Sequence, residues 1–166
     1  MTIPTEDECL QILKLNKVPE NIIRHSIAVA NLAENIATKL QKHGINVNLA
    51  LVKAASLLHD IKRLSSDHSR DGARFLKDAG YIEVAEIVRR HGLKDLNLGV
   101  HPQTLEEKIV FYADKRVTED QIVSIRERFD MLKVKYSQVA QEIEETYQYV
   151  VDLEQELQRM CPDIID

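Results

Sequence analysis

Residues 49–60, LALVKAASLLHD, form an apolar run with helical spacing that ends on two strong metal ligands, His59 and Asp60. His59 follows Ala55 and Val52 by four and seven residues, so the imidazole shares their helix face and should point inward. Polar side chains at the end of such a face are costly to desolvate unless something pairs with them. The pattern therefore favours a metal ion as the partner of this pair.

Other potential ligands stand at comparable places along the chain, namely His25, His68, His91 and Asp114. His25 shares a helix face with Val29 and Leu32, and Asp114 follows Val110 by four residues, so both side chains should point inward. An inward carboxylate without a partner would shift its pKa and neutralise, or destabilise the domain. Ligands from separate helices solve this problem by sharing a cation, although for any single histidine a hydrogen-bonded core position is the simpler alternative.

In chain order these ligands read H…HD…H…H…D. That order, together with LLHDIKR at residues 57–63, resembles the HD superfamily of metal-dependent phosphohydrolases and a variant of its HDIG motif. The resemblance covers about residues 19–129. It implies a first metal site built by His25, His59, Asp60 and Asp114.

In subfamilies with two ions, the resemblance implies that Asp60 bridges to a second ion held by His68 and His91. Alternatively, His68 simply begins a helix and His91 is a cation near a helix C-terminus, where its charge is favourable. We exclude His43, which fits that helix-end role better, and His101, which lies beside Pro102 in a loop. Imidazoles mixed with carboxylates, without a thiolate, suit one or two divalent transition metal ions such as Fe, Mn, Zn or Ni.

The resemblance implies hydrolysis of phosphate esters or anhydrides, and metal chemistry fits this reaction. A divalent ion lowers the pKa of bound water from ~15.7 towards 7 and stabilises the oxygens of a phosphoryl group. We expect Asp60, Arg63 and Lys115 to act in catalysis, the last two as cations beside the substrate phosphate. Other candidate cations are Lys62, Arg116, Arg126 and Arg128, of which Arg126 fits a surface ion pair better. Lys62 replaces the glycine of the HDIGK-type motif and Arg63 its lysine.

Every clearly periodic segment has the helical period, so the sequence predicts an all-α fold, an HD-domain helical bundle with long C-terminal helices. Helices are expected over residues 5–15, 19–43, 47–59, 67–79 and 82–91, followed by a loop over residues 93–103. A capping box at Thr5 opens the first helix, and Gly44, Gly80 and Gly92 should end three others. We expect a single domain over residues 1–166, with its core at about 19–129 and a helical extension at about 121–160.

Residues 104–161 contain neither glycine nor proline, which predicts one or two long helices with a break near residues 118–121. Apolar side chains repeat there at the first and fourth positions of a heptad, with Thr146 as one polar exception: Phe129, Leu132, Tyr136, Val139, Ile143, Val150, Leu153 and Leu157. Such a stripe is typical of a helix packed on its own bundle. The alternative is a homodimer interface through the C-terminal helices.

Composition excludes several classes of protein. The 166 residues are 44% hydrophobic, enough for one sizeable core. A net charge of −5 argues against binding a nucleic-acid duplex through a broad basic face. No leader-like segment and no apolar run of ~20 residues is present, so we expect a cytoplasmic protein without membrane contact. Cys9 and Cys161 lie far apart without a CxxC pattern, so no disulfide framework or thiolate zinc site is expected.

Two classes of function fit these observations. The first is a metal-dependent phosphohydrolase that cleaves a nucleotide or another small phosphate ester or anhydride with a metal-activated water. The second is a non-catalytic module that binds a metal or a nucleotide and acts through protein partners, because a fold by itself does not decide function.

Overall fold

A computed structural model of the chain describes residues 2–164. Its elements, in chain order, are α1 (Glu6–Leu15), α2 (Glu20–Lys42), α3 (Leu49–Leu58), α4 (His68–Asp78), α5 (Ile82–Arg89), α6 (Leu93–Leu96), α7 (Leu105–Asp114), β1 (Val117–Thr118), β2 (Gln121–Ile122), α8 (Ile125–Lys135), the 3₁₀ helix η1 (Ser137–Val139), α9 (Ala140–Glu145) and α10 (Tyr147–Met160). The predicted all-α class is confirmed. Within the described residues, no helix combines the length and the apolar character needed to cross a bilayer.

Local sequence signals explain most helix ends. The Thr5 side chain accepts a hydrogen bond from the Glu8 amide while the Glu8 carboxylate accepts one from the Thr5 amide, which is the predicted capping box. Gly44 and Gly80 follow α2 and α4 with φ of 78° and 89°, left-handed values that glycine adopts without steric cost. Gly92 does not act in this way, because α5 has already ended at Arg89 and the φ of Gly92 is −82°.

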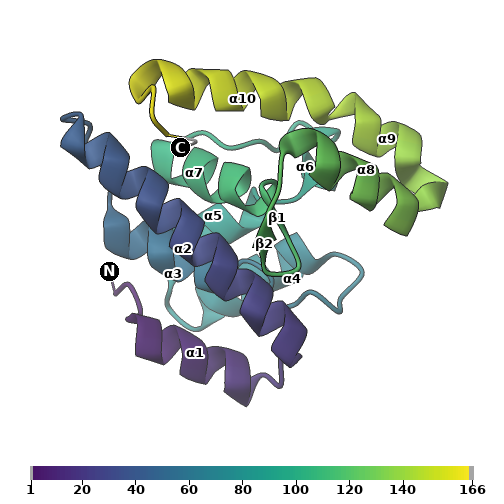
Figure 1. Cartoon of the computed structure of the whole chain (residues 1–166). Helices are drawn as coiled ribbons and strands as arrows, with labels where there is room; N and C mark the ends of the chain where they lie inside the picture. Colours follow the sequence, from purple (N-terminus) through teal and green to yellow (C-terminus); the bar gives the residue numbers. More distant parts are fainter. Residues whose placement is uncertain (1, 165–166) are drawn as a thin grey trace.

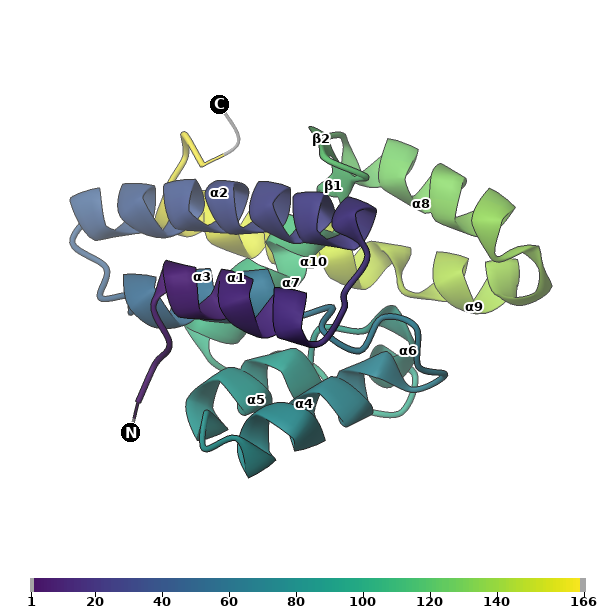
Figure 2. The same cartoon turned by 90° about the horizontal axis from the view of Figure 1, so that it is seen from below.

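The long helix α2 packs along both α3 and α7, and these three helices form the centre of the bundle. Figure 1 shows α2 crossing in front of α3, with α1 on one side and α10 lying along α7 on the other. The pair α4 and α5 covers a further side of the core, as the view in Figure 2 shows. The central helices therefore bring α2, the end of α3 and the end of α7 into one buried region.

The C-terminal third differs from the one or two long helices that the sequence predicts. The break near residues 118–121 is present, but it contains a two-stranded antiparallel hairpin, β1 and β2, with Glu119 at a φ of 53° in its turn. Two more interruptions follow α8 and α9. The expected loop over residues 93–103 also contains the single-turn helix α6.

Thr146, the polar exception in the heptad pattern, marks one of those interruptions. Its buried hydroxyl donates to the Ile143 carbonyl at 2.7 Å, where α9 ends and α10 begins. Most apolar members of the stripe are buried within this chain, including Phe129, Val150 and Leu157, and each contributes roughly 1.5–3 kcal/mol by its burial. Val139 is 45% exposed. The stripe thus packs mainly on the bundle itself.

Candidate metal centre

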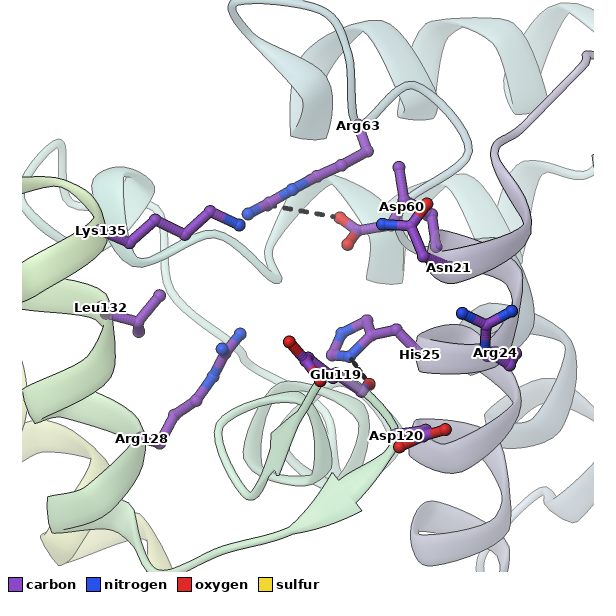
Figure 3. Close-up of a pocket in the computed structure, with 11 residues that line it drawn as sticks. Asn21, Arg24, His25, Asp60, Arg63, Glu119, Asp120, Arg128, Leu132 and Lys135 are labelled. Atoms are coloured by element: carbon purple, nitrogen blue, oxygen red, sulfur yellow. Dashed lines mark hydrogen bonds and ion pairs between the residues drawn. The ribbon is translucent and has the colours of Figure 1, made fainter.

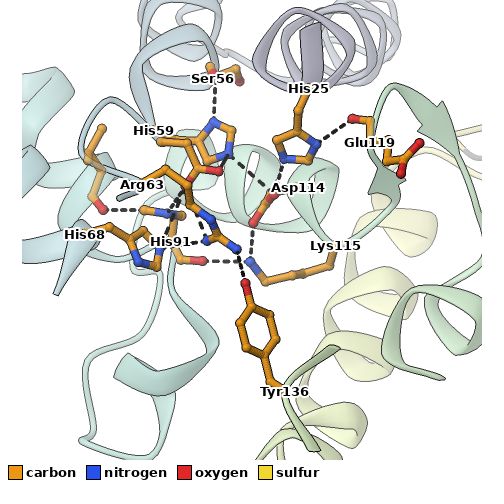
Figure 4. A network of polar contacts seen from close by, with 12 residues as sticks. His25, Ser56, His59, Arg63, His68, His91, Asp114, Lys115, Glu119 and Tyr136 are labelled. Carbon is orange, nitrogen blue, oxygen red and sulfur yellow. Dashed lines mark hydrogen bonds and ion pairs between the residues drawn. The ribbon is translucent and has the colours of Figure 1, made fainter. Parts of the chain in front are cut away.

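Six side chains from five parts of the fold converge in the buried region beside α2. They belong to the residues that sequence analysis singles out as ligands: His25, His59, Asp60, His68, His91 and Asp114. Figure 4 shows His25, His59, His68, His91 and Asp114 among them. His25 lies on α2, His59 and Asp60 directly follow α3, and Asp114 is the last residue of α7. His68 begins α4 and His91 lies two residues beyond α5. The structure therefore brings all six together from positions up to 89 residues apart.

The donor atoms form two neighbouring sets of three residues each. In the first set, the Asp114 Oδ1 atom lies 3.0 Å from His25 Nε2 and 3.5 Å from His59 Nε2. In the second, the Asp60 Oδ1 atom lies 3.5 Å from His91 Nε2 and 3.8 Å from His68 Nε2. Within each set, one donor atom of every residue lies within 4.8 Å of the others.

Asp60 connects the two sets. Its Oδ2 atom lies 3.5 Å from His59 Nε2 in the first set, while Oδ1 faces the second. The imidazole rings also follow one another closely, with centroids of 5.1 Å between His59 and His91 and 5.2 Å between His68 and His91. A carboxylate with one oxygen toward each set has the arrangement needed to bridge two cations.

Main-chain carbonyls orient three of the histidines in the same way. The Nδ1 atoms of His25, His59 and His91 lie 2.8, 2.7 and 2.6 Å from the carbonyl oxygens of Glu119, Ser56 and Val88. A carbonyl only accepts, so each Nδ1 carries the proton and each Nε2 presents its lone pair toward the carboxylates in the neutral ring. Two facing acceptors need a proton or a cation between them. Metal-binding histidines are commonly oriented by such contacts.

Buried donor atoms without hydrogen bonds are a second observation that fits a divalent ion at this site. His59 Nε2, His91 Nε2 and Asp60 Oδ1 are buried and have no hydrogen-bond partner among the described residues. Three buried polar atoms without a hydrogen bond in one place carry a substantial desolvation cost, of about 1–3 kcal/mol each. A cation coordinated by all of them would remove that cost, and nitrogen with carboxylate oxygen is the ligand mixture that transition metals accept.

The pKa shifts of Asp114 and His68 suit metal binding near neutral pH, whereas burial of His59 is outweighed by Asp60 and Asp114, which raise the pKa of that imidazole. Burial opposes ionisation of Asp114, but the Lys115 ammonium and the contacts with His25 and His59 hold the pKa of its carboxyl well below the usual range. Burial and the neighbouring His91 lower the pKa of His68 to about 4, so this imidazole is neutral at pH 7. Ionised carboxylates and neutral imidazoles are the forms that coordinate metals.

The HD domain model matches residues 22–119, more than half of the chain and all six converging residues. The chain belongs to the HD-domain family. Most HD domains are metal-dependent phosphohydrolases, and HD domains bind divalent metals.

Several relatives align with much of this chain, which spans less than half the length of two of them. A tRNA (cytidine(56)-2′-O)-methyltransferase of Picrophilus torridus is 36% identical over 148 residues, which cover 80% of this chain and 42% of the relative. An uncharacterized protein of Methanocaldococcus jannaschii is 36% identical over 138 residues, covering 70% of this chain and 81% of the relative. Ribonuclease Y of Rubrobacter xylanophilus is 36% identical over 100 residues, 57% of this chain and 18% of the relative. No solved structure gives a significant match.

Arg63, one of the expected cations, lies beside the ligands Asp60 and His68. Its Nη1 atom is 3.6 Å from Asp60 Oδ1 and 3.2 Å from His68 Nε2, while its Nη2 atom donates to the Tyr136 hydroxyl at 2.9 Å. The burial of Arg63 would lower the pKa of the guanidinium, but Asp60 outweighs this effect and raises it. Tyr136, from the segment after α8, is therefore part of the site.

Lys115 takes a more enclosed position than a substrate-binding cation usually has. It is buried, and its Nζ atom donates to the Asp114 carboxylate and, at 2.9 Å, to the His91 carbonyl. Burial lowers the pKa of this ammonium, against the attraction of Asp114. Lys115 thus joins a ligand of the first set to the main chain of the second.

The remaining expected cations divide by position. Lys62 points away from the ligands, with its ammonium on Asn16 Oδ1 at 3.2 Å and over the ring of Phe75. Arg116 pairs with Glu154 at 3.2 Å, and Arg126 pairs with Glu144 at 3.2 Å. Arg128 instead lines two cavities beside the ligands. The excluded histidines lie elsewhere: His43 beside Cys161 and Asp163, and His101 near Tyr149.

Gly92 lets the chain after α5 approach α4 closely. A Cβ atom on Gly92 would lie 2.5 Å from Asp95 Oδ2 and 2.7 Å from Ser69 Oγ, which is closer than real contacts allow. Ser69 follows His68, so this close approach holds His68 near His91. The HG dipeptide at residues 91–92 is a signal for this close approach, although the sequence pattern predicts a helix end at Gly92. The carbonyls of Ser56, Val88 and Glu119 carry no side-chain signal.

Proposed function

We propose that this HD domain is a phosphohydrolase that cleaves a nucleotide or another small phosphate ester or anhydride and depends on divalent metal. The observation that carries the proposal is the convergence of His59 Nε2, His91 Nε2 and Asp60 Oδ1, which are buried and have no hydrogen-bond partner among the described residues. The family supports it, since most of its members are metal-dependent phosphohydrolases.

Each ligand has a role in this proposal. His25, His59, Asp60 and Asp114 would hold one divalent transition metal ion, and Asp60 with His68 and His91 would hold a second. When bound, such ions supply Lewis acidity, which lowers the pKa of water towards neutrality and neutralises charge on a phosphoryl group. The carbonyls that accept from the histidine Nδ1 atoms keep the rings in the tautomer that coordinates through Nε2.

Residues and cavities around the ligands suit the binding of a phosphate. Arg63 presents a permanently charged guanidinium beside Asp60, where it can donate two hydrogen bonds to a phosphate. Lys115 keeps Asp114 ionised and in place through its contact with that carboxylate. Two cavities of about 280 and 390 Å³ open on the ligands, large enough for a small phosphorylated molecule.

Relatives support a substrate that contains a nucleotide. By their printed names, the methyltransferase acts on a cytidine of tRNA and ribonuclease Y acts on RNA. This chain spans 42% and 18% of the length of those two proteins. For this chain, the activities of the whole proteins are therefore proposals.

The alternative function is a non-catalytic HD module that binds metal or nucleotide and acts through a partner. Its support is the relative named a methyltransferase, of which this segment covers less than half. In that case the protein would bind metal without hydrolysing phosphate esters.

A hydrolysis panel separates the two functions. Protein purified without chelator is assayed for metal content and then for release of phosphate from a generic aryl phosphate and from nucleoside mono-, di- and triphosphates. We expect release that chelator abolishes and that added Mn²⁺, Fe²⁺, Zn²⁺ or Ni²⁺ restores. Metal content without any release would favour the non-catalytic module.

Arg63→Ala should weaken substrate handling while metal stays bound. A charge-assisted hydrogen bond to phosphate contributes roughly 1.5–3 kcal/mol, so kcat/KM should fall about tenfold or more. The matched control is Lys62→Ala, which removes the adjacent cation that points away from the ligands. Unchanged kcat/KM in Arg63→Ala on every substrate of the wild type would show that Arg63 does not contact the phosphate.

A further inference from the structure

Helix α8 lies outside the segment that matches the HD domain, residues 22–119, yet it forms a wall of the site. A cavity of about 280 Å³ lies between α8 and α2 and reaches His25 and Asp60. Figure 3 shows Arg128 and Lys135 of α8 extending into this space opposite Asp60 and His25, with Arg63 beside Lys135. A region outside the family segment thus contributes cations to the site.

The basic residues of α8 divide into two groups by their partners. Arg126 and Lys133 lie on the side facing α9 and bind the Glu144 carboxylate at 3.2 and 2.6 Å. Arg128 and Lys135 are seven residues apart and share one helix face, with Leu132 between them. All three residues of that face line the cavity. The division shows that the cavity-facing pair is not held by the surface ion-pair network.

Arg128 has no ionic partner among residues 2–164. Within the described part of the chain, its Nε atom is buried and forms no hydrogen bond, and no carboxylate lies within ion-pair distance of its guanidinium. Lys135 likewise has no carboxylate partner in the described chain, and its ammonium lies 5.5 Å from the Tyr136 ring. A buried guanidinium Nε–H without an acceptor is costly, and an anion is the ligand that would satisfy it.

The position of Arg128 separates it from the reacting phosphate. Arg128, Arg63 and Leu132 line both cavities. Arg128 therefore lies between the cavity that reaches Asp60 and the second cavity, which reaches His68 and His91. Lys135 lines only the first cavity and contacts none of the six ligands. Arg63 already pairs with Asp60, and Lys115 with Asp114, directly at the ligands. The α8 pair is therefore suited to an anionic group beyond the one at the metals.

We propose that Arg128 and Lys135 form a subsite for a second phosphate of the substrate, one that is not cleaved. The substrate would then be a nucleotide with a polyphosphate chain or an oligonucleotide end with an adjoining phosphodiester. This inference rests on the proposed function, because it takes the first phosphate to lie at the metal ligands.

Binding of uncleavable probes tests the subsite independently of hydrolysis. Methylenediphosphonate carries two phosphonate groups and methylphosphonate carries one, and neither is hydrolysed. Their dissociation constants are measured by calorimetry on the metal-loaded full chain with free divalent ion in excess. We expect wild type to prefer the diphosphonate, and the double variant Arg128→Ala with Lys135→Ala to lose roughly tenfold or more of that preference.

The control removes the same charge from the other face of α8, through Arg126→Ala with Lys133→Ala, and should keep the preference. Circular dichroism checks that both double variants are folded. An equal preference in wild type and in the Arg128 and Lys135 variant would overturn the subsite, as would the absence of any preference in wild type. Comparing the binding of α,β-methylene-ADP with that of a phosphorothioate dinucleotide then shows whether the second phosphate belongs to a polyphosphate chain or to a phosphodiester.

A clear diphosphonate preference without hydrolysis of any substrate would refute the phosphohydrolase but would still support the subsite.

Discussion

Asp60→Ala is expected to abolish hydrolysis and to release metal from the protein. Asp60 faces both ligand sets, with Oδ2 at 3.5 Å from His59 and Oδ1 at 3.5 Å from His91, so its loss affects every ion that the site holds. Removing it also leaves the Arg63 guanidinium without its carboxylate. Because bound metal stabilises the native state by mass action, the melting temperature of the metal-loaded protein should fall as well.

The measurement for Asp60→Ala combines elemental analysis, the hydrolysis assay and thermal unfolding with and without chelator. Chelator should lower the melting temperature of wild type and leave that of the variant unchanged. Asp67→Ala, which removes an aspartate from the same loop but outside the ligand sets, is the control and should behave as wild type. Wild-type metal content and activity in Asp60→Ala would contradict the whole site.

His68→Ala and His91→Ala should each reduce the metal content by about half while the fold is kept. Both residues belong to the second set, and the first set would still offer His25, His59, Asp60 and Asp114 to one ion. Activity should fall much more than stability does, since two ions can stabilise both the entering and the leaving oxygen in phosphoryl transfer. Elemental analysis of the two variants beside wild type provides the test, with His101→Ala as the control histidine.

Other roles for these two histidines predict a different result. If His91 were only a cation near the end of α5 and His68 only the first residue of α4, each substitution would cost about 0.3–1 kcal/mol of stability. Metal content would then be unchanged. Unchanged stoichiometry in both variants would reduce the site to one ion and shift the expected substrates towards nucleoside monophosphates.

Much of the bundle is predictable because its signals are local. The capping residue Thr5 and the glycines Gly44 and Gly80 mark helix ends in the sequence as they do in the structure. The C-terminal third was predictable in part, since Ser124 and Glu127 form a capping box that announces α8. Counting only glycine and proline misses that start, and it also misses the hairpin whose turn is made by Glu119.

Inward-facing ligands are predictable from helical spacing, because His25 and Asp114 each share a face with apolar neighbours. The main-chain partners of the histidines are not predictable, since any residue type supplies a carbonyl, as Ser56 and Val88 do here. The contact between Arg63 and Tyr136 joins residues 73 positions apart and depends on how α8 packs, which periodicity does not determine. For the same reason Arg128 and Arg126 look alike in the sequence and differ in the structure.

Titration of the chelator-stripped wild-type chain with Mn²⁺, Fe²⁺, Zn²⁺ and Ni²⁺ tests most directly whether the two ligand sets form a metal centre. Calorimetry gives the stoichiometry, and thermal unfolding gives the stabilisation. We expect saturable binding of two ions per chain for at least one of these metals, with a rise in melting temperature. No saturable binding of any of the four would contradict it.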